Sequence, residues 1–159
     1  MEEENPARVV LGVGPHIAPA GPINLTLHTY SRLMDNVSKT VQRLKRARPG
    51  LWIAWKTVSG GGLCRKRPFE KQLPPFAAAE VPNHRVFPLM DELAVAAMKK
   101  AGVDAVLDLS PLYLRPDAHP GSQGAGGAPH PDCLHLCPPG PLDLIGPLLH
   151  RAIGHTAPC

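Results

Sequence analysis

Short apolar runs that alternate with longer amphipathic segments are the feature that most constrains the fold of this chain. Residues 9–13 (VVLGV), 51–58 (LWIAWKTV) and 105–109 (AVLDL) have the length and composition of buried β-strands. Between them, residues 25–48 and 88–100 carry apolar side chains at three- and four-residue steps, which predicts helices. This alternation predicts an α/β fold in which helices cover both faces of a parallel sheet.

Turn-forming residues mark the ends of these elements. Pro49 and Gly50 follow the first predicted helix, and Gly102 follows the second. Residues 142–153 predict a third helix near the end of the chain. Because proline lacks a backbone N–H, we expect the Gly146-Pro147 pair to kink or shorten that helix.

Composition and charge narrow the class of protein. With 159 residues, 43% of them hydrophobic and 19% charged, the chain has the size of a single globular domain. The formal net charge of +4 favours an anionic partner, but only 4% of the residues are aromatic, so we expect no nucleic-acid partner. Four basic residues lie near the end of the first predicted helix, where cations suit the helix dipole: Arg43, Lys45, Arg46 and Arg48. The sequence predicts no membrane segment.

Three loops follow the predicted strands, and parallel strands bring such loops to one edge of the sheet. Functional sites of open α/β sheets gather at the carboxyl ends of the strands. Here those ends precede Gly14, the glycine-rich turn at 59–62, and a Pro/Gly-rich loop over 111–141. We therefore expect the functional residues at this edge.

The stretch at 130–143 (HPDCLHLCPPGPLD) combines residue types that suit three kinds of site. Cys133, His135 and Cys137, with His119 and His130 upstream, are types that bind zinc. A structural zinc site also requires a second close pair of ligands, which the isolated remaining cysteines do not supply. We therefore predict no metal site.

A disulfide interpretation draws on all the cysteines of the chain. The four residues Cys64, Cys133, Cys137 and Cys159 could form two disulfides, in three alternative pairings that the sequence does not distinguish. In a reducing compartment, four buried thiols would be expected instead.

A catalytic interpretation rests on Asp132 and His135. An acid three residues before a histidine can orient the imidazole and leave its other nitrogen free as a general base. Such a base must activate a nucleophile, usually a serine. Ser59 and Ser122 lie in predicted loops, but the chain contains neither a G-x-S-x-G nor a Gly-Asp-Ser motif.

The sequence contains four short blocks of note: LDLS at 107–110, RPDAHP at 115–120, DCLHLCPPG at 132–140, and GGLC at 61–64. Together these blocks resemble the plant trichome birefringence-like proteins, in the PC-esterase branch of the SGNH (GDSL) superfamily. Residues 11–16 are similar to a strand of that family that ends in a glycine. The resemblance extends over most of the chain.

This resemblance implies a fold, an activity and a set of roles. The fold would be an SGNH-hydrolase-like three-layer sandwich, and the activity the transfer or hydrolysis of acetyl groups on polysaccharide hydroxyls. Asp132 and His135 would belong to a Ser-His-Asp triad, Gly14 to the oxyanion hole, and Cys64 would pair with a cysteine beside His135. No cofactor is expected to be bound, and acetyl-CoA or an acetylated intermediate would be the acyl donor. Family members lie in the Golgi, where disulfides persist.

The sequence also departs from the family pattern. The family's Gly-Asp-Ser nucleophile lies on an earlier strand, the Pro-x-His-Phe before the Gly-Gly-x-Cys is absent, and Leu136 stands where the family has tryptophan. We therefore expect residues 1–159 to form one N-terminally incomplete domain that lacks the first strand of the sheet. The function expected is that of the C-terminal portion of an O-acetyltransferase or esterase. The alternative is a non-catalytic remnant that binds glycan or a protein partner.

Overall fold

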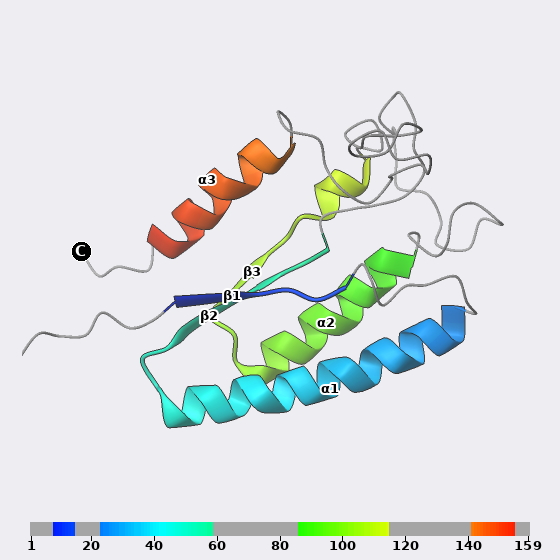
Figure 1. The fold of residues 1–159 in the computed structure, drawn as a ribbon, viewed down its shortest axis with the longest axis horizontal. Helices are drawn as coiled ribbons and strands as arrows, with labels where there is room; N and C mark the ends of the chain where they lie inside the picture. Colours follow the sequence, from blue (N-terminus) through cyan, green and yellow to red (C-terminus); the bar gives the residue numbers. More distant parts are fainter. Residues whose placement is uncertain (1–7, 15–22, 59–85, 115–140, 155–159) are drawn as a thin grey trace, which may run out of the picture.

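Three parallel strands and three α-helices make up the part of the chain that the computed structural model describes, residues 8–14, 23–58, 86–114 and 141–154 (Figure 1). The elements follow one another as the sequence predicts. In chain order they are β1 (Arg8–Leu11), α1 (Ile23–Ala47), β2 (Trp52–Lys56), α2 (Phe87–Ala101), β3 (Ala105–Leu107), the 3-10 helix η3 (Ser110–Leu114) and α3 (Pro141–Gly154).

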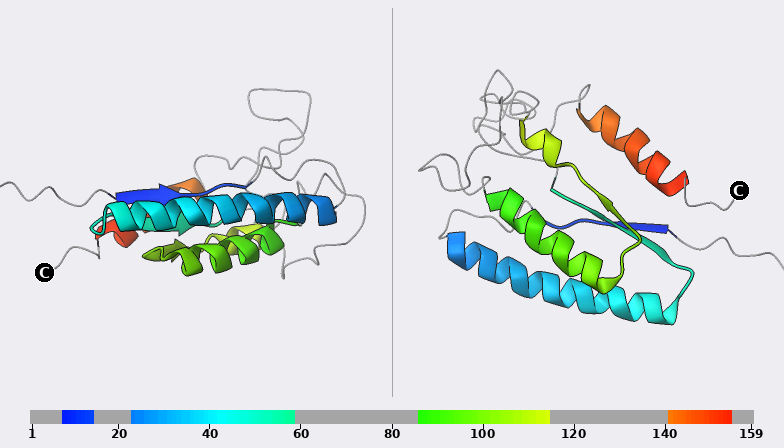
Figure 2. Two further views of the ribbon diagram at one scale, coloured as in Figure 1. Left: turned by 90° about the horizontal axis from the view of Figure 1, so that it is seen from below. Right: turned by 180° about the vertical axis from the view of Figure 1, so that it is seen from behind.

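The sheet has the strand order β1-β2-β3, and both pairs of strands are parallel. Right-handed crossovers between successive parallel strands place the connecting helices on the same face. Accordingly α1 and α2 lie side by side on one face, and α3 lies on the other (Figures 1 and 2). The predicted α/β fold with a parallel sheet is confirmed. Among the described residues β1 pairs only with β2, so its other side forms an edge of the sheet.

The predicted helices agree with the structure within a few residues, whereas the strands are shorter than predicted. Strand β1 ends at Leu11, because the pairing with β2 does not extend to residues 12–14. Strand β2 ends at Lys56. The expected shortening of the last helix is wrong, since α3 runs without interruption through Pro147. Pro147 is exposed, and it removes only one backbone N–H donor from the helix. The residues on both sides of it remain helical.

The hydrophobic core lies between the sheet and the pair α1 and α2. Buried side chains recur at helical spacing in both helices and at alternate positions of β2, where Ile53 and Trp55 are fully buried. Each such side chain contributes about 1.5–3 kcal/mol through burial. The helical members are Tyr30, Met34 and Val41 from α1, with Phe87, Met90, Ala94, Met98 and Ala101 from α2.

The amino edge of the sheet is closed by short connections and one ion pair. The Lys45 ammonium lies 2.7 Å from a carboxylate oxygen of Asp104 and donates to the carbonyl of Leu51 at 3.0 Å. The same Asp104 oxygen accepts the Ile53 N–H at 2.7 Å. Gly102, at φ 86°, ends α2 in the left-handed conformation that glycine adopts without strain. These contacts join the end of α1 to the starts of β2 and β3.

Candidate functional site

The carboxyl ends of the three strands meet at the opposite edge of the sheet. Gly12 to Gly14 follow β1, Thr57 and Val58 follow β2, and Asp108 to Ser110 follow β3. In parallel α/β sheets this is the edge that carries functional loops. The described residues here form a buried polar network, which we take as the candidate site.

Gly14, the expected oxyanion-hole residue, is buried at this edge. A Cβ added to Gly14 would stand 2.5 Å from a methyl group of Val58, and one added to Gly12 would stand 3.0 Å from the carbonyl oxygen of Lys56. Both glycines therefore allow the extensions of β1 and β2 to approach closely. The close packing against Val58 is sufficient to explain why residue 14 is a glycine. The role of Gly14 in an oxyanion hole stays a prediction.

Tyr30 fixes the extension of β1 to helix α1. Its hydroxyl donates to the carbonyl of Val13 at 3.0 Å, and the side chain is fully buried. Burial raises the pKa of Tyr30, and the negative charge of Asp91 raises it further. The phenol consequently stays protonated and keeps its hydrogen bond to the strand.

Asp91 of α2 is a buried acid at the same edge. It is 7% exposed, and its carboxylate accepts the buried N–H of Val58 at 2.9 Å. The sequence alone does not single out Asp91 as a site residue. Its spacing does give a signal, because Asp91 follows Phe87 by four residues and precedes Ala94 by three, on the face that packs into the core.

Lys56, the last residue of β2, brings a cation to the edge. Its ammonium donates to the Thr57 carbonyl at 3.1 Å. Burial lowers the pKa of Lys56, and the charge of Asp91 opposes that shift. The Asp91 carboxylate and the Lys56 ammonium therefore attract each other across this edge of the sheet.

Thr57 links the ends of β2 and β3. Its hydroxyl donates to the Leu107 carbonyl at 3.3 Å and accepts the Leu109 N–H at 2.7 Å. Directly afterwards, the Asp108 carboxylate accepts the Ser110 N–H at 2.8 Å, at the start of η3. The network therefore holds all three strand ends in fixed relative positions, as a support from which loops can present side chains.

Most of the residues predicted for the site lie outside the described residues. These are the catalytic pair Asp132 and His135 and all four cysteines, Cys64, Cys133, Cys137 and Cys159. In the chain, Ser59 follows the described Val58 directly, and Arg115 follows the described Leu114. Of the predicted site residues, the structure thus describes Gly14 alone.

Within the ranges 8–14, 23–58, 86–114 and 141–154, no three His, Cys, Asp or Glu side chains are grouped so that they could hold a metal ion. Among those same residues, no helix has the length and apolar character needed to cross a membrane. No family model, characterised protein or solved structure matches this chain.

Proposed function

We propose that this chain is the C-terminal portion of an O-acetyltransferase or esterase that acts on polysaccharide hydroxyls, with an SGNH-like fold. The observation that carries the proposal is the sequence block at 132–140, DCLHLCPPG, which follows RPDAHP at 115–120. The parallel α/β sheet supports it, because such sheets bear catalytic loops at the carboxyl edge, and both blocks follow β3 in the chain.

In this proposal Asp132 accepts a hydrogen bond from the His135 imidazole and holds it in the tautomer of a general base. His135 removes the proton from a serine hydroxyl, which attacks the acetyl carbonyl. His135 then returns the proton to the leaving oxygen, and an acetyl-enzyme remains. A sugar hydroxyl or water releases the acetyl group in the second half of the reaction, and the Gly14 N–H stabilises the oxyanion of both steps.

The serine of this scheme belongs to a Gly-Asp-Ser motif that the 159 residues do not contain. We therefore expect an in-frame segment encoded upstream to supply it. The 159-residue chain alone should release no acetate from acetyl-xylan and no 4-nitrophenol from 4-nitrophenyl acetate. Activity of this chain that is abolished by Ser59→Ala or Ser122→Ala would contradict the proposal.

The decisive experiment expresses the upstream coding segment together with residues 1–159 and measures acetate release from acetyl-xylan. We expect turnover, and we expect His135→Ala or Asp132→Ala to lower kcat by roughly 10³-fold or more. His150→Ala, an exposed histidine of α3, is the matched control and should leave kcat unchanged. An inactive extended protein that still binds acetyl-xylan would favour the non-catalytic alternative.

The cysteines allow a separate test. The proposal places the domain in the oxidising Golgi lumen, with Cys64 linked to Cys133 or Cys137. Peptide mapping under non-reducing conditions, on protein secreted from a eukaryotic host, should recover that link. Four free thiols in the secreted protein would contradict this part of the proposal.

A further inference from the structure

The edge of the sheet at β3 has backbone groups that face away from the other strands. Within the ranges 8–14, 23–58, 86–114 and 141–154, β3 pairs with β2 alone. On the paired side the Leu107 carbonyl accepts the Thr57 N–H at 3.0 Å. Because successive residues of a strand turn their backbone groups to opposite sides, the N–H and C=O of Val106 face the outer side. Such an edge can pair with a further strand.

A groove of about 260 Å³ lies along this edge, between β3 and helix α3. Most of its lining is apolar and comes from both elements: Val106, Leu107, Leu109, Leu148 and Ala152. The side chain of Leu148 is 49% exposed, although it lies beside other apolar groups. A partner that pairs with the strand and covers Leu148 would satisfy the backbone groups and bury the apolar surface together.

Two charged side chains, Asp108 and Arg151, line opposite ends of the groove. Helix α3 runs antiparallel to β3 (Figures 1 and 2), and the Arg8 guanidinium at the start of β1 donates to the Ile153 carbonyl. Arg151 therefore lies toward the amino edge of the sheet, whereas Asp108 follows β3 at the carboxyl edge. Both side chains are exposed, and neither forms an ion pair with another described residue. The groove thus has a cation at one end and a carboxylate at the other.

We propose that the β3 edge pairs antiparallel with the β3 edge of a second copy of this chain, which joins two three-stranded sheets into one of six strands. On a two-fold axis through this contact, the Val106 residues of the two copies exchange two N–H···O=C bonds. The axis also reverses the groove of the second copy, so each Arg151 meets the Asp108 of the other copy, and this ion pair forms twice. The proposal does not rest on the proposed function.

The residues around Val106 are compatible with this register. Ala105 lies opposite Leu107 of the second copy, which makes an apolar cross-strand pair on each side of the axis. Asp104 lies opposite Asp108 of the second copy, and like charges that face each other destabilise a sheet. Here the Lys45 ammonium, 2.7 Å from Asp104, already compensates that carboxylate. The remaining carboxylate, Asp108, is the one that meets Arg151.

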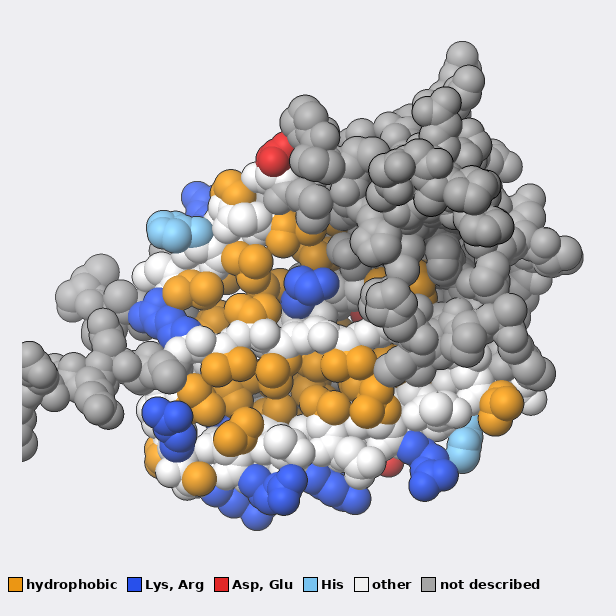
Figure 3. Space-filling view, viewed as in Figure 1, with side chains coloured by type: hydrophobic (Ala, Val, Ile, Leu, Met, Phe, Trp, Pro, Cys, Tyr) orange, Lys and Arg blue, Asp and Glu red, His pale blue; other side chains and the backbone are white. Residues whose placement is uncertain are grey.

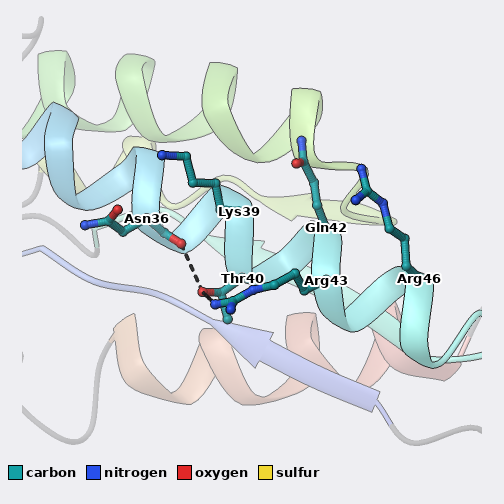
Figure 4. A pocket seen from close by; sticks show the side chains of 6 residues that line it. All are labelled: Asn36, Lys39, Thr40, Gln42, Arg43 and Arg46. Carbon is teal, nitrogen blue, oxygen red and sulfur yellow. Dashed lines mark hydrogen bonds between the residues drawn. The ribbon is translucent and has the colours of Figure 1, made fainter.

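The opposite edge of the sheet, at β1, lacks this self-complementarity. Figure 3 shows hydrophobic side chains beside β1 and Lys and Arg side chains along the neighbouring helix α1. That helix contains five basic residues and one acidic residue, Asp35. Its cations Lys39, Arg43 and Arg46 line a polar hollow of about 520 Å³ on its outer side (Figure 4). Two copies that met at β1 would bring α1 helices of like charge toward each other, so we assign the contact to β3.

Analytical ultracentrifugation of the 159-residue protein tests the proposal. From about 5 to 200 μM, it should show a monomer–dimer equilibrium that follows mass action. R151E and D108K each bring like charges together at two places in the dimer, so each should raise its Kd about tenfold. The double variant R151E/D108K exchanges the two charges and should return the Kd close to that of the wild type. K100E and E92K make the same charge changes on the exposed side of α2 and should leave it unchanged.

Hydrogen exchange locates the contact. Amides of residues 104–109 should exchange more slowly at high than at low concentration of the wild type, and R151E should lose that dependence. Slower exchange at residues 8–11 instead would place the contact at β1 and overturn the proposal. A protein that stays monomeric throughout would also overturn it and would leave the β3 edge to a different occupant, such as a strand of another protein. A double variant as weak as either single variant would show that Arg151 and Asp108 do not meet across the contact.

Discussion

The two edges of the sheet are held by hydrogen bonds of similar length in very different surroundings. At the amino edge, Asp104 accepts the Ile53 N–H at 2.7 Å, and its side chain is 32% exposed. At the carboxyl edge, Asp91 accepts the Val58 N–H at 2.9 Å and is 7% exposed. Because water can replace a lost partner only where it has access, equal bonds should differ in their contribution to stability.

The connections between elements also differ in length between the two edges. Four residues join α1 to β2 and three join α2 to β3 at the amino edge. At the carboxyl edge the chain leaves for much longer segments, among them the one that contains Asp132 and His135. The buried network of Tyr30, Thr57 and Asp91 therefore stabilises the edge from which the predicted catalytic residues follow.

The largest effect should come from Asp91→Ala. This change leaves the buried Val58 N–H without its acceptor and should lower the free energy of unfolding by about 3 kcal/mol. Glu92→Ala, at an exposed neighbour, is the control and should change it by about 0.5 kcal/mol at most. Urea denaturation measures both, and the comparison fails if Asp104→Ala proves as costly as Asp91→Ala.

A pair of glycine substitutions tests the close packing of the carboxyl edge. Gly14→Ala places a Cβ 2.5 Å from a methyl group of Val58 and should cost about 1–3 kcal/mol. Gly146→Ala meets no atom within 4 Å and should stabilise α3 by up to about 1 kcal/mol. Thermal unfolding of the two variants should therefore shift in opposite directions. A neutral Gly14→Ala would show that the strand ends can separate at little cost.

Tyr30 makes the stability of the folded protein depend on pH. Its pKa is raised on folding, so above about pH 10 the unfolded chain loses the proton first and stability falls as pH rises. Lys56 acts in the opposite sense, because its lowered pKa makes stability rise as pH approaches 10.5 from below.

Tyr30→Phe separates the two effects, because Lys56 is common to both proteins. The variant should lose about 1 kcal/mol near neutral pH with the hydrogen bond to Val13, and this deficit should shrink above pH 10. Urea denaturation across that range measures it. A deficit that stays constant with pH would show that Tyr30 does not titrate differently in the folded state.

The sequence predicts the architecture well because the apolar periodicity of each segment reports burial directly. The order of elements and the parallel sheet follow from residues such as Ile53, Trp55 and Met98, whose spacing identifies the buried face. The ends of the strands are predicted less well, because they depend on contacts with segments that are distant in the sequence. Gly12 packs closely against Lys56, and the Thr57 hydroxyl accepts the Leu109 N–H.

The candidate site is harder to predict for a physical reason. Asp91 looks like an acid that favours a helix N-terminus, and only the packing of α2 against β2 shows that it accepts the Val58 N–H. Thr57 similarly gains its role from the position of Leu109, 52 residues later. Asp132 and His135 come instead from a sequence motif, which needs no tertiary contact to be recognised but does not give their geometry.

The smallest effect should be the coupling between Lys45 and Asp104 at the amino edge. Both side chains are partly exposed, at 23% and 32%, so their interaction should contribute about 0.5–1 kcal/mol. A double-mutant cycle of Lys45→Met and Asp104→Asn isolates that term, because asparagine can still accept the Ile53 N–H. Added salt should reduce the coupling further, as it does for exposed charges. If the coupling instead exceeds the cost of Asp91→Ala and resists salt, the amino edge rather than the carboxyl edge holds the sheet together.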